Sequence, residues 1–306
     1  MIPSNSLPWQ AKTWQTQLSG AVTQVQDLAQ ILGLSDNVED WDADPTFPMR
    51  VPMPYISRMS HGDRRDPLLR QVMPQLAERI DAVGFESDPL LEASTAPTPG
   101  LMHKYQGRVL VIAAEHCAVN CRYCFRRDFS YAKHRHDTTF PMLDYVRDDA
   151  SIREVILSGG DPLIMPDQRL NKLVASIEAI PHVKRLRIHT RLPVVIPQRV
   201  CRPLIEMLVN TRLSTTIVAH FNHANEIDKD VAIAFAALRQ AGITLLNQSV
   251  LLAGVNDDDV ALYDLSEALF EVGILPYYLH LPDRVRGTSH FHIDTDTATR
   301  LHTTIQ

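Results

Sequence analysis

Short apolar runs alternate with amphipathic stretches along the last two thirds of this 306-residue chain. Runs rich in Val, Ile and Leu predict strands at 108–114, 154–159, 185–190, 215–221, 243–251 and 274–280. Helical periodicity between them predicts helices at 138–149, 166–180, 197–210, 226–241, 258–272 and 294 to the end. Six β-α units in succession indicate an α/β fold with a parallel sheet and right-handed crossovers.

Polar residues gather where these predicted strands end. They are Ser158, Gly159, Gly160 and Asp161 after the second strand, His189 and Arg191 after the third, His220 and Asn222 after the fourth, Asn247 and Gln248 on the fifth, and His280 and Asp283 after the sixth. Strand ends often meet solvent, but polar clusters at successive ends are typical of the catalytic face of a barrel. We therefore predict a partial, open βα barrel of about six units, with a doubly wound sheet as the alternative.

The first hundred residues have a different pattern. Helical periodicity runs through 14–34 and 66–80, and four prolines between positions 45 and 54 interrupt regular structure. A Pro- and Ser-rich connection at 87–100 suggests a boundary. We divide the chain into a mainly helical N-terminal segment, 1–100, and a barrel, 101–306.

Composition excludes several classes of protein. Charged residues make up 22% of the chain and the net charge is −6, with no basic block, so we expect no nucleic-acid partner. No apolar run is long enough to span a membrane, and the N-terminus does not resemble a signal peptide. Four cysteines are too few for a disulfide framework, and we expect a cytoplasmic protein.

Three of the cysteines form the motif C-x3-C-x2-C in "AEHCAVNCRYCFRR", directly after the first predicted strand. Zinc would need a fourth ligand, which His116, His134 or His136 could supply. An iron–sulfur cluster held by three thiolates keeps one iron open for a substrate. We favour a catalytic [4Fe–4S] cluster on Cys117, Cys121 and Cys124, and interpret the isolated Cys201 as an ordinary helix residue.

This motif resembles that of the radical S-adenosylmethionine (SAM) superfamily. The segments "HKYQGRVLVIAAEHCAVNCRYCFRR", "LSGGDPL", "HTRLPVVIPQR", "HFNHANEI", "LLNQSVLL" and "LPYYLH" are similar, in the same order, to those of the lysine 2,3-aminomutase family. Within that family they look most like the branch that acts on behalf of elongation factor P. The resemblance implies an isomerase that converts L-lysine to (R)-β-lysine, which a partner ligase attaches to elongation factor P.

The resemblance also implies the site residues. Ser158, Gly159, Gly160, Asp161, His220 and Gln248 match positions that line the SAM pocket. Lys104, Tyr105 and Arg108 match the pocket for pyridoxal 5′-phosphate (PLP), although the family has an arginine where this chain has Lys104. Arg126 matches the arginine that binds the substrate carboxylate, a bidentate task, and Asp283 matches an aspartate that binds the distal ammonium of lysine. Without the resemblance, "HKYQGR" would be interpreted as a solvated turn.

One expected residue has no match. In the family, a lysine that holds PLP covalently lies in a glycine-rich segment beyond the last barrel strands. This chain ends at "ATRLHTTIQ", and none of its six lysines falls at a matching place. We therefore expect a C-terminally shortened chain that keeps the cluster and SAM sites but binds PLP weakly and has little mutase activity.

Two other functions stay open at this point. One is a related 2,3-aminomutase that acts on another amino acid such as glutamate, although Asp283 argues against an acidic substrate. The other is a non-catalytic, metal-stabilised protein that binds a partner.

Overall fold

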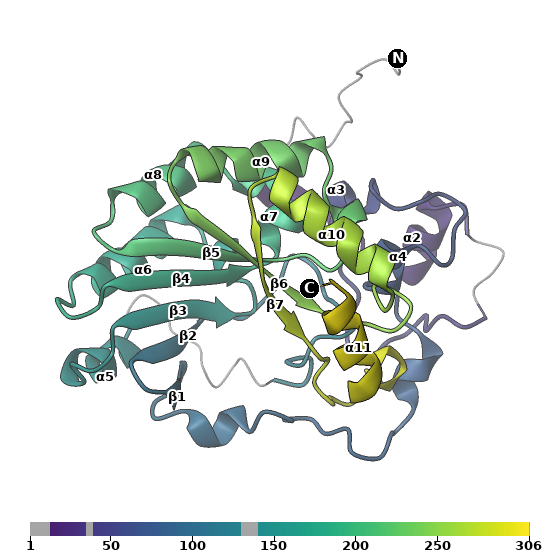
Figure 1. Cartoon of the computed structure of the whole chain (residues 1–306), viewed down its shortest axis with the longest axis horizontal. Coiled ribbons are helices and arrows are strands. Elements are labelled where there is room, and N and C mark those ends of the chain that lie inside the picture. The colour runs from purple at the N-terminus through teal and green to yellow at the C-terminus, as the bar shows by residue number, and fades with distance from the viewer. Residues whose placement is uncertain (1–12, 35–38, 130–139, 306) are drawn as a thin grey trace.

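A single curved sheet forms the centre of the computed structural model, which describes residues 13–34, 39–129 and 140–305 (Figure 1). Its seven strands lie in sequence order, and they are β1 Leu101–Tyr105, β2 Arg108–Ala114, β3 Glu154–Gly159, β4 Arg185–Thr190, β5 Ser214–His220, β6 Thr244–Val250 and β7 Leu275–His280. Strands β2 to β7 pair in parallel, while β1 is antiparallel to β2. Since β1 and β7 form the two edges of the sheet, the barrel is open. The predicted α/β partial barrel of six βα units is confirmed.

The antiparallel strand β1 was not predicted. The turn between β1 and β2 contains Gly107, whose φ of +77° suits glycine and few other residues. Tyr105 and Arg108 pair across this turn. The segment "HKYQGR" is therefore a β-hairpin at one edge of the sheet.

Helices connect the parallel strands. They are α5 Met142–Asp148, α6 Asp167–Glu178, α7 Leu192–Val195, α8 Arg202–Asn210, α9 Lys229–Gln240 and α10 Asp259–Glu271, with 3-10 turns η4 Pro162–Ile164, η5 Pro197–Arg199 and η6 Ala224–Glu226. The turn η7 Ser289–Phe291 and the helix α11 Thr295–Ile305 follow the last strand. Asp228 and Asp258 begin α9 and α10 by accepting backbone N–H groups at 2.9 Å. Among the described residues, no helix has the length and apolar character that crossing a membrane requires.

The single helix predicted at 197–210 is wrong, because η5 and α8 are separate. Pro203 occupies the first turn of α8, and a helix that ran through it from residue 197 would bring its ring against the carbonyl of Arg199. Cys201 therefore lies at the N-cap of α8 rather than within a helix.

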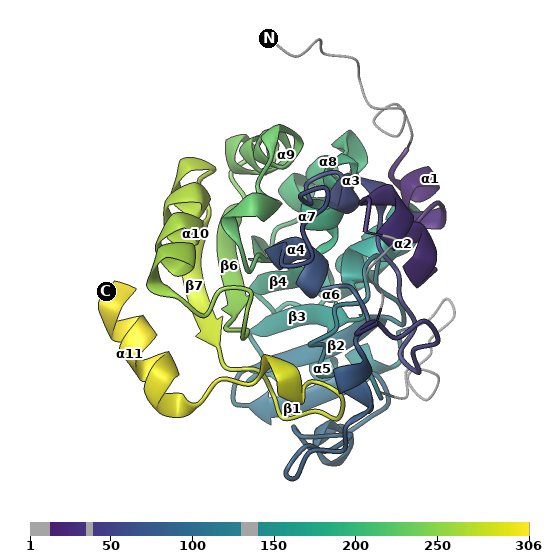
Figure 2. The ribbon, with the colours of Figure 1, turned by 90° about the vertical axis from the view of Figure 1, so that its right-hand side faces the viewer.

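The N-terminal segment is built from short elements: α1 Trp14–Ser19, α2 Val25–Ile31, α3 Met53–Ile56, α4 Pro67–Arg70, η1 Leu76–Arg79 and η2 Glu92–Thr95. The long helices predicted at 14–34 and 66–80 are thus wrong. Val22 leaves the helix to pair with Val51, and Pro74 has no N–H with which to continue a helix. The segment packs across the end of the barrel that faces the viewer in Figure 2 and shares one apolar core with the sheet and its helices. The division at residue 100 remains a prediction.

The two faces of the sheet differ in character. On β4, Leu186 and Ile188 are buried in the apolar core, while Arg187 and His189, which alternate with them, are only half-buried. The alternation follows from the two-residue period of a strand. It places Leu186 and Ile188 against the apolar core and Arg187 and His189 on the opposite face of the sheet.

Candidate active site

The three clustered cysteines lie on the loop that follows β2, at the carboxyl end of the parallel strands. All three are half-buried free thiols. Burial raises the pKa of the Cys117 thiol, and the neighbouring Cys124 and Cys121 raise it further. Burial also raises the pKa of Cys124 to about 11. Both thiols are therefore protonated at neutral pH, and a metal that binds them as thiolates must displace their protons.

The N-terminal segment holds this cysteine loop in place. The backbone N–H of Asn120 donates to the Arg50 carbonyl (3.0 Å), and that of Arg122 donates to the Gln71 carbonyl (2.9 Å). The fully buried Arg122 side chain also binds the Glu78 carboxylate, with its Nε 2.8 Å away. The segment thus fixes the loop from the side opposite the sheet.

Two glycines allow the cysteine loop to pass close to the end of β3. A Cβ on Gly160 would lie 2.2 Å from the His116 carbonyl oxygen, and one on Gly159 would lie 2.6 Å from that of Ala114. Gly159 also has a φ of +119°. The backbone N–H groups of Gly160 and Asp161 donate to Ala114 and His116, each at 2.8 Å. These residues therefore pack the cysteine loop onto the sheet, besides being candidates for the SAM pocket.

Asp161 is buried, and its carboxylate is occupied by the protein itself. Oδ1 accepts the Leu163 N–H (3.0 Å) and the Thr190 hydroxyl (2.6 Å). Oδ2 accepts the N–H groups of Arg191 (2.7 Å) and Leu192 (2.8 Å). Because four donors fill its acceptor positions, the side chain joins the ends of β3 and β4. The assignment of Asp161 to the SAM pocket remains a prediction.

His220 and Gln248 lie side by side, since they are paired across β5 and β6. His220 Nε2 lies 2.9 Å from the hydroxyl of Tyr123, within the cysteine motif, and the two rings stack at 5.6 Å. Burial lowers the pKa of His220 well below its usual value, so the imidazole is neutral at pH 7. The structure therefore brings His220 directly against the cysteine loop.

Arg126 is buried and already has a carboxylate partner. Its Nε and Nη2 donate to the two oxygens of Glu92 at 2.9 and 2.7 Å, and its Nη1 donates to Ser158 Oγ at 3.1 Å. Glu92 opens η2 and is itself buried. A substrate carboxylate that approached Arg126 would thus meet Glu92 in the same place.

Asp283 follows β7 and lies near this pair. The backbone of Glu86 bonds to Arg284 and Arg286, each at 2.9 Å, which places the chain that leads to Glu92 beside Asp283. Burial raises the pKa of Asp283, an effect that His280 opposes and Glu92 reinforces. The positive charges of Lys104 and Arg126 lower the pKa of Asp283. Arg126 and Asp283, the two residues expected to select lysine, are therefore close enough for the charge of one to affect the other.

Lys104, Tyr105 and Arg108 lie together at the β1–β2 hairpin. Arg108 stacks on the ring of Tyr105 at 4.6 Å, and Lys104 Nζ donates to the Leu90 carbonyl at 2.7 Å. Tyr105 is 62% exposed. Since Arg108 begins β2 and the cysteines follow its last residue, this group lies at the opposite end of that strand from the cysteine loop.

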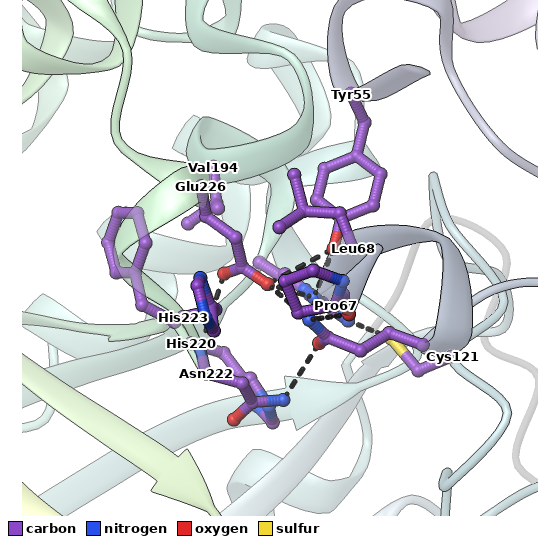
Figure 3. Close-up of polar contacts among 12 residues, drawn as sticks. Tyr55, Pro67, Leu68, Cys121, Val194, His220, Asn222, His223 and Glu226 are labelled. Carbon is purple, nitrogen blue, oxygen red and sulfur yellow. Dashed lines mark hydrogen bonds and ion pairs between the residues drawn. The ribbon is translucent and has the colours of Figure 1, made fainter. Parts of the chain in front are cut away.

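A buried polar network beside the cysteines was missed from the sequence. Figure 3 shows Tyr55, Asn222 and Glu226 pointing toward one another near Cys121. Arg191, which had been given no role, lies among them and donates to Cys121 Sγ at 2.6 Å. Its signals in the sequence were its place at the end of the third predicted strand and within "HTRLPVVIPQR", one of the segments that carry the family resemblance.

Arg127 was also missed. It lies directly after the motif, and its side chain is 5% exposed and binds Glu78 at 2.7 Å. It therefore helps Arg122 to attach the cysteine loop to the N-terminal segment.

The zinc alternative gains no support from the arrangement of the side chains. Across residues 13–34, 39–129 and 140–305, no three His, Cys, Asp or Glu side chains are placed to hold a single metal ion. His134 and His136 lie outside the described residues. In a four-iron cluster each thiolate binds a different iron, so the three sulfurs need not converge on one point.

Comparison with known proteins supports the iron–sulfur interpretation. A family model described as the Radical SAM superfamily matches residues 111–265, which include the three cysteines and the strands β3 to β6. The matched range begins within β2, at the strand that leads into the cysteine loop.

Several curated proteins are similar over nearly the whole chain. The L-lysine 2,3-aminomutase of Haemophilus influenzae is 45% identical, over 100% of this chain and 92% of that protein. The enzyme of the same name from Escherichia coli is 45% identical, over 94% of this chain and 85% of its own length. That of Clostridium subterminale is 35% identical over 91% and 68%, respectively.

Proposed function

This chain belongs to the radical SAM superfamily and, within it, to the L-lysine 2,3-aminomutase family, and on that premise we propose that it converts L-lysine to (R)-β-lysine. Membership implies a [4Fe–4S] cluster and SAM. The single observation that carries the choice of substrate is the 45% identity to two L-lysine 2,3-aminomutases, over 100% and 94% of this chain. The charges of Arg126 and Asp283 would match the carboxylate and the distal ammonium of lysine.

The cluster and SAM would occupy the carboxyl end of the barrel. When bound, they supply the electron and the 5′-deoxyadenosyl radical that start the reaction. Cys117, Cys121 and Cys124 would hold the cluster as thiolates. The residues Ser158 to Gly160, together with His220 and Gln248, would line the SAM pocket. Asp161 would support this pocket indirectly, because its carboxylate accepts hydrogen bonds from η4, from β4 and from the start of α7.

PLP would be held at the β1–β2 hairpin. Arg108 and Lys104 are cationic and Tyr105 offers an aromatic ring, so the residues present suit a phosphate and the ring beside it. The ammonium group of Lys104 is a point charge, whereas the guanidinium of an arginine could donate two parallel hydrogen bonds to a phosphate. Lys104 would therefore fix the orientation of the phosphate less precisely. When bound, PLP supplies the group that lets the amino nitrogen migrate. Borohydride reduction with PLP, followed by peptide mapping, would identify any lysine that holds it covalently.

The product would serve elongation factor P. We infer that a partner ligase attaches (R)-β-lysine to a lysine of that factor in the cytoplasm, and the support is the likeness of "CAVNCRYCFRR" and "LPYYLHLPDRVRGTSHF" to the branch of the family that does this. Mass spectrometry of elongation factor P from cells that lack this chain tests the link. If elongation factor P from those cells still carries the mass of the β-lysyl group, this chain does not supply that modification.

An anaerobic assay tests the proposed reaction. The reconstituted protein receives L-lysine, SAM, PLP and a reductant, and chromatography resolves α-lysine from β-lysine. We expect 5′-deoxyadenosine and β-lysine to form only when the reductant is present. Isomerisation of glutamate but not lysine would point to a related aminomutase, and a protein that neither binds iron nor cleaves SAM would point to a partner-binding role.

A further inference from the structure

Arg191 is the side chain that joins the cysteine loop to the buried network. It follows β4 at the carboxyl end of the barrel and is 7% exposed. Its Nη1 donates to Cys121 Sγ and to the Tyr123 hydroxyl, both at 2.6 Å. Its Nη2 faces the other way, toward Glu226 Oε1 at 2.8 Å. One edge of the guanidinium thus faces a cluster cysteine and the other faces a carboxylate.

The network leaves this guanidinium little freedom. Nη2 also donates to Gln71 Oε1 (2.7 Å) and to the Tyr55 hydroxyl (3.0 Å). The backbone N–H of Arg191 is bound by Asp161 at 2.7 Å. Partners at both ends of the residue therefore hold the positive charge beside Cys121.

Glu226 is fully buried and is held by the same network. Its Oε1 also accepts hydrogen bonds from Tyr55 (3.1 Å) and Gln71 (2.9 Å), and its Oε2 accepts the Asn222 N–H (3.2 Å) (Figure 3). The carboxylate lies on the side of the guanidinium that faces away from Cys121. The arginine charge is therefore nearer to the cysteine sulfur than the charge that balances it.

A charge in this position acts on the electron that a cluster takes up. Hydrogen bonds to ligand sulfurs and nearby charges set the reduction potential of an iron–sulfur cluster. A guanidinium remains cationic at any physiological pH. Reduction adds one negative charge to the cluster, and a fixed cation in a buried site favours that added charge more strongly than one in water.

We propose that Arg191 sets the reduction potential of the cluster by donating to the sulfur of Cys121, with Glu226 holding it in place. The proposal rests on the cluster assignment within the proposed function. Arg191 acts as a positioning residue, because it touches a cluster ligand rather than the reacting atoms. The rival explanation is that Arg191 only balances the buried charge of Glu226.

The test compares variants by their reduction potential. Arg191→Gln alone would leave Glu226 buried without its partner and endanger folding, so it is combined with Glu226→Gln. The double variant and the single variant Glu226→Gln are reconstituted anaerobically, and iron per chain is measured first. Anaerobic redox titration, followed by electron paramagnetic resonance of the reduced cluster, then gives the midpoint potential.

The two variants should shift the potential in opposite directions. We expect the double variant to be harder to reduce by about tenfold in the one-electron equilibrium, which corresponds to about 59 mV. Glu226→Gln should make reduction easier, because it removes the negative charge and keeps the positive one. A purely structural role would not produce shifts of opposite sign.

Arg199 provides a matched control. It is also fully buried, pairs with Asp167 at 2.8 Å and lies 3.5 Å from the sulfur of Cys201, which is outside the cluster motif. Arg199→Gln combined with Asp167→Asn should leave the potential unchanged. If the double variant of Arg191 and Glu226 binds its iron and keeps the wild-type potential, the proposal is wrong. A wild-type chain that binds no cluster would instead refute the proposed function.

Discussion

Gly160→Ala tests how the cysteine loop is packed onto the sheet. The added Cβ would lie 2.2 Å from the His116 carbonyl oxygen and 2.6 Å from the His116 carbonyl carbon. Real Cβ atoms essentially never approach closer than 3.0 Å, so the backbone beside Cys117 must move by about 0.8 Å. Both partners are backbone atoms, and no side-chain rotation can relieve the contact.

The cost can be worked from the contacts that this shift affects. Overpacking of a tightly packed site costs about 1–3 kcal/mol. The shift also strains the 2.8 Å bond from Asp161 N–H to His116 O, and losing a buried hydrogen bond costs about 1–3 kcal/mol. We expect the free energy of unfolding of the metal-free protein to fall by at least about 2 kcal/mol. Because Cys117 follows His116, the iron bound per chain should also fall.

Urea unfolding of the metal-free protein and iron analysis after anaerobic reconstitution measure the two effects. Gly20→Ala is the control, because its Cβ would meet only the Thr16 carbonyl at 3.3 Å, at the end of α1. That variant should bind iron normally and lose less than about 1 kcal/mol. If Gly160→Ala unfolds at the wild-type urea concentration and takes up the wild-type amount of iron, the packing argument is wrong.

Three further predictions concern the ligands. Replacing any one of the three motif cysteines with Ala should abolish reductive SAM cleavage, while Cys201→Ala should not; cleavage that survives in a motif variant would exclude that cysteine as a ligand. Asp283→Asn should raise the KM for lysine without weakening SAM binding. Burial raises the pKa of Asp283, so its carboxylate is charged only above that raised pKa. The affinity for lysine should therefore increase as the pH rises through this range in the wild type and not in the variant. If Asp283→Asn weakens lysine binding and SAM binding equally, Asp283 has a structural role. Glu92→Gln should lower the KM for lysine, because the substrate carboxylate no longer competes with another carboxylate for Arg126; a higher KM would show that Glu92 instead orients the arginine.

Much of the barrel could be predicted from local pattern alone. The strands β2, β3 and β4 begin and end where the apolar runs do; β5 and β6 differ from them by one residue at each end, and β7 differs by one residue at its start. Most of these runs are short, contain β-branched residues and precede an amphipathic helix, so the local conformational preference agrees with the environment that the fold provides. In the N-terminal segment, the local helical preference and the observed structure differ. Its helical periodicity at 14–34 was overridden by the pairing of Val22 with Val51, a contact that depends on a distant residue.

The candidate site divides in the same way. The C-x3-C-x2-C spacing by itself predicts a metal or iron–sulfur site on the loop after β2, because ligands that are close in sequence must also lie close together in space. Only the tertiary structure decided what surrounds that loop. It paired Glu92 with Arg126 and surrounded the Asp161 carboxylate with four hydrogen-bond donors. It also brought Arg191 and Glu226 together beside Cys121. These partners come from separate strands and from the N-terminal segment, and a buried charge must find its counter-charge wherever the fold provides one. Such pairings depend on how the elements pack, which short-range sequence pattern does not encode.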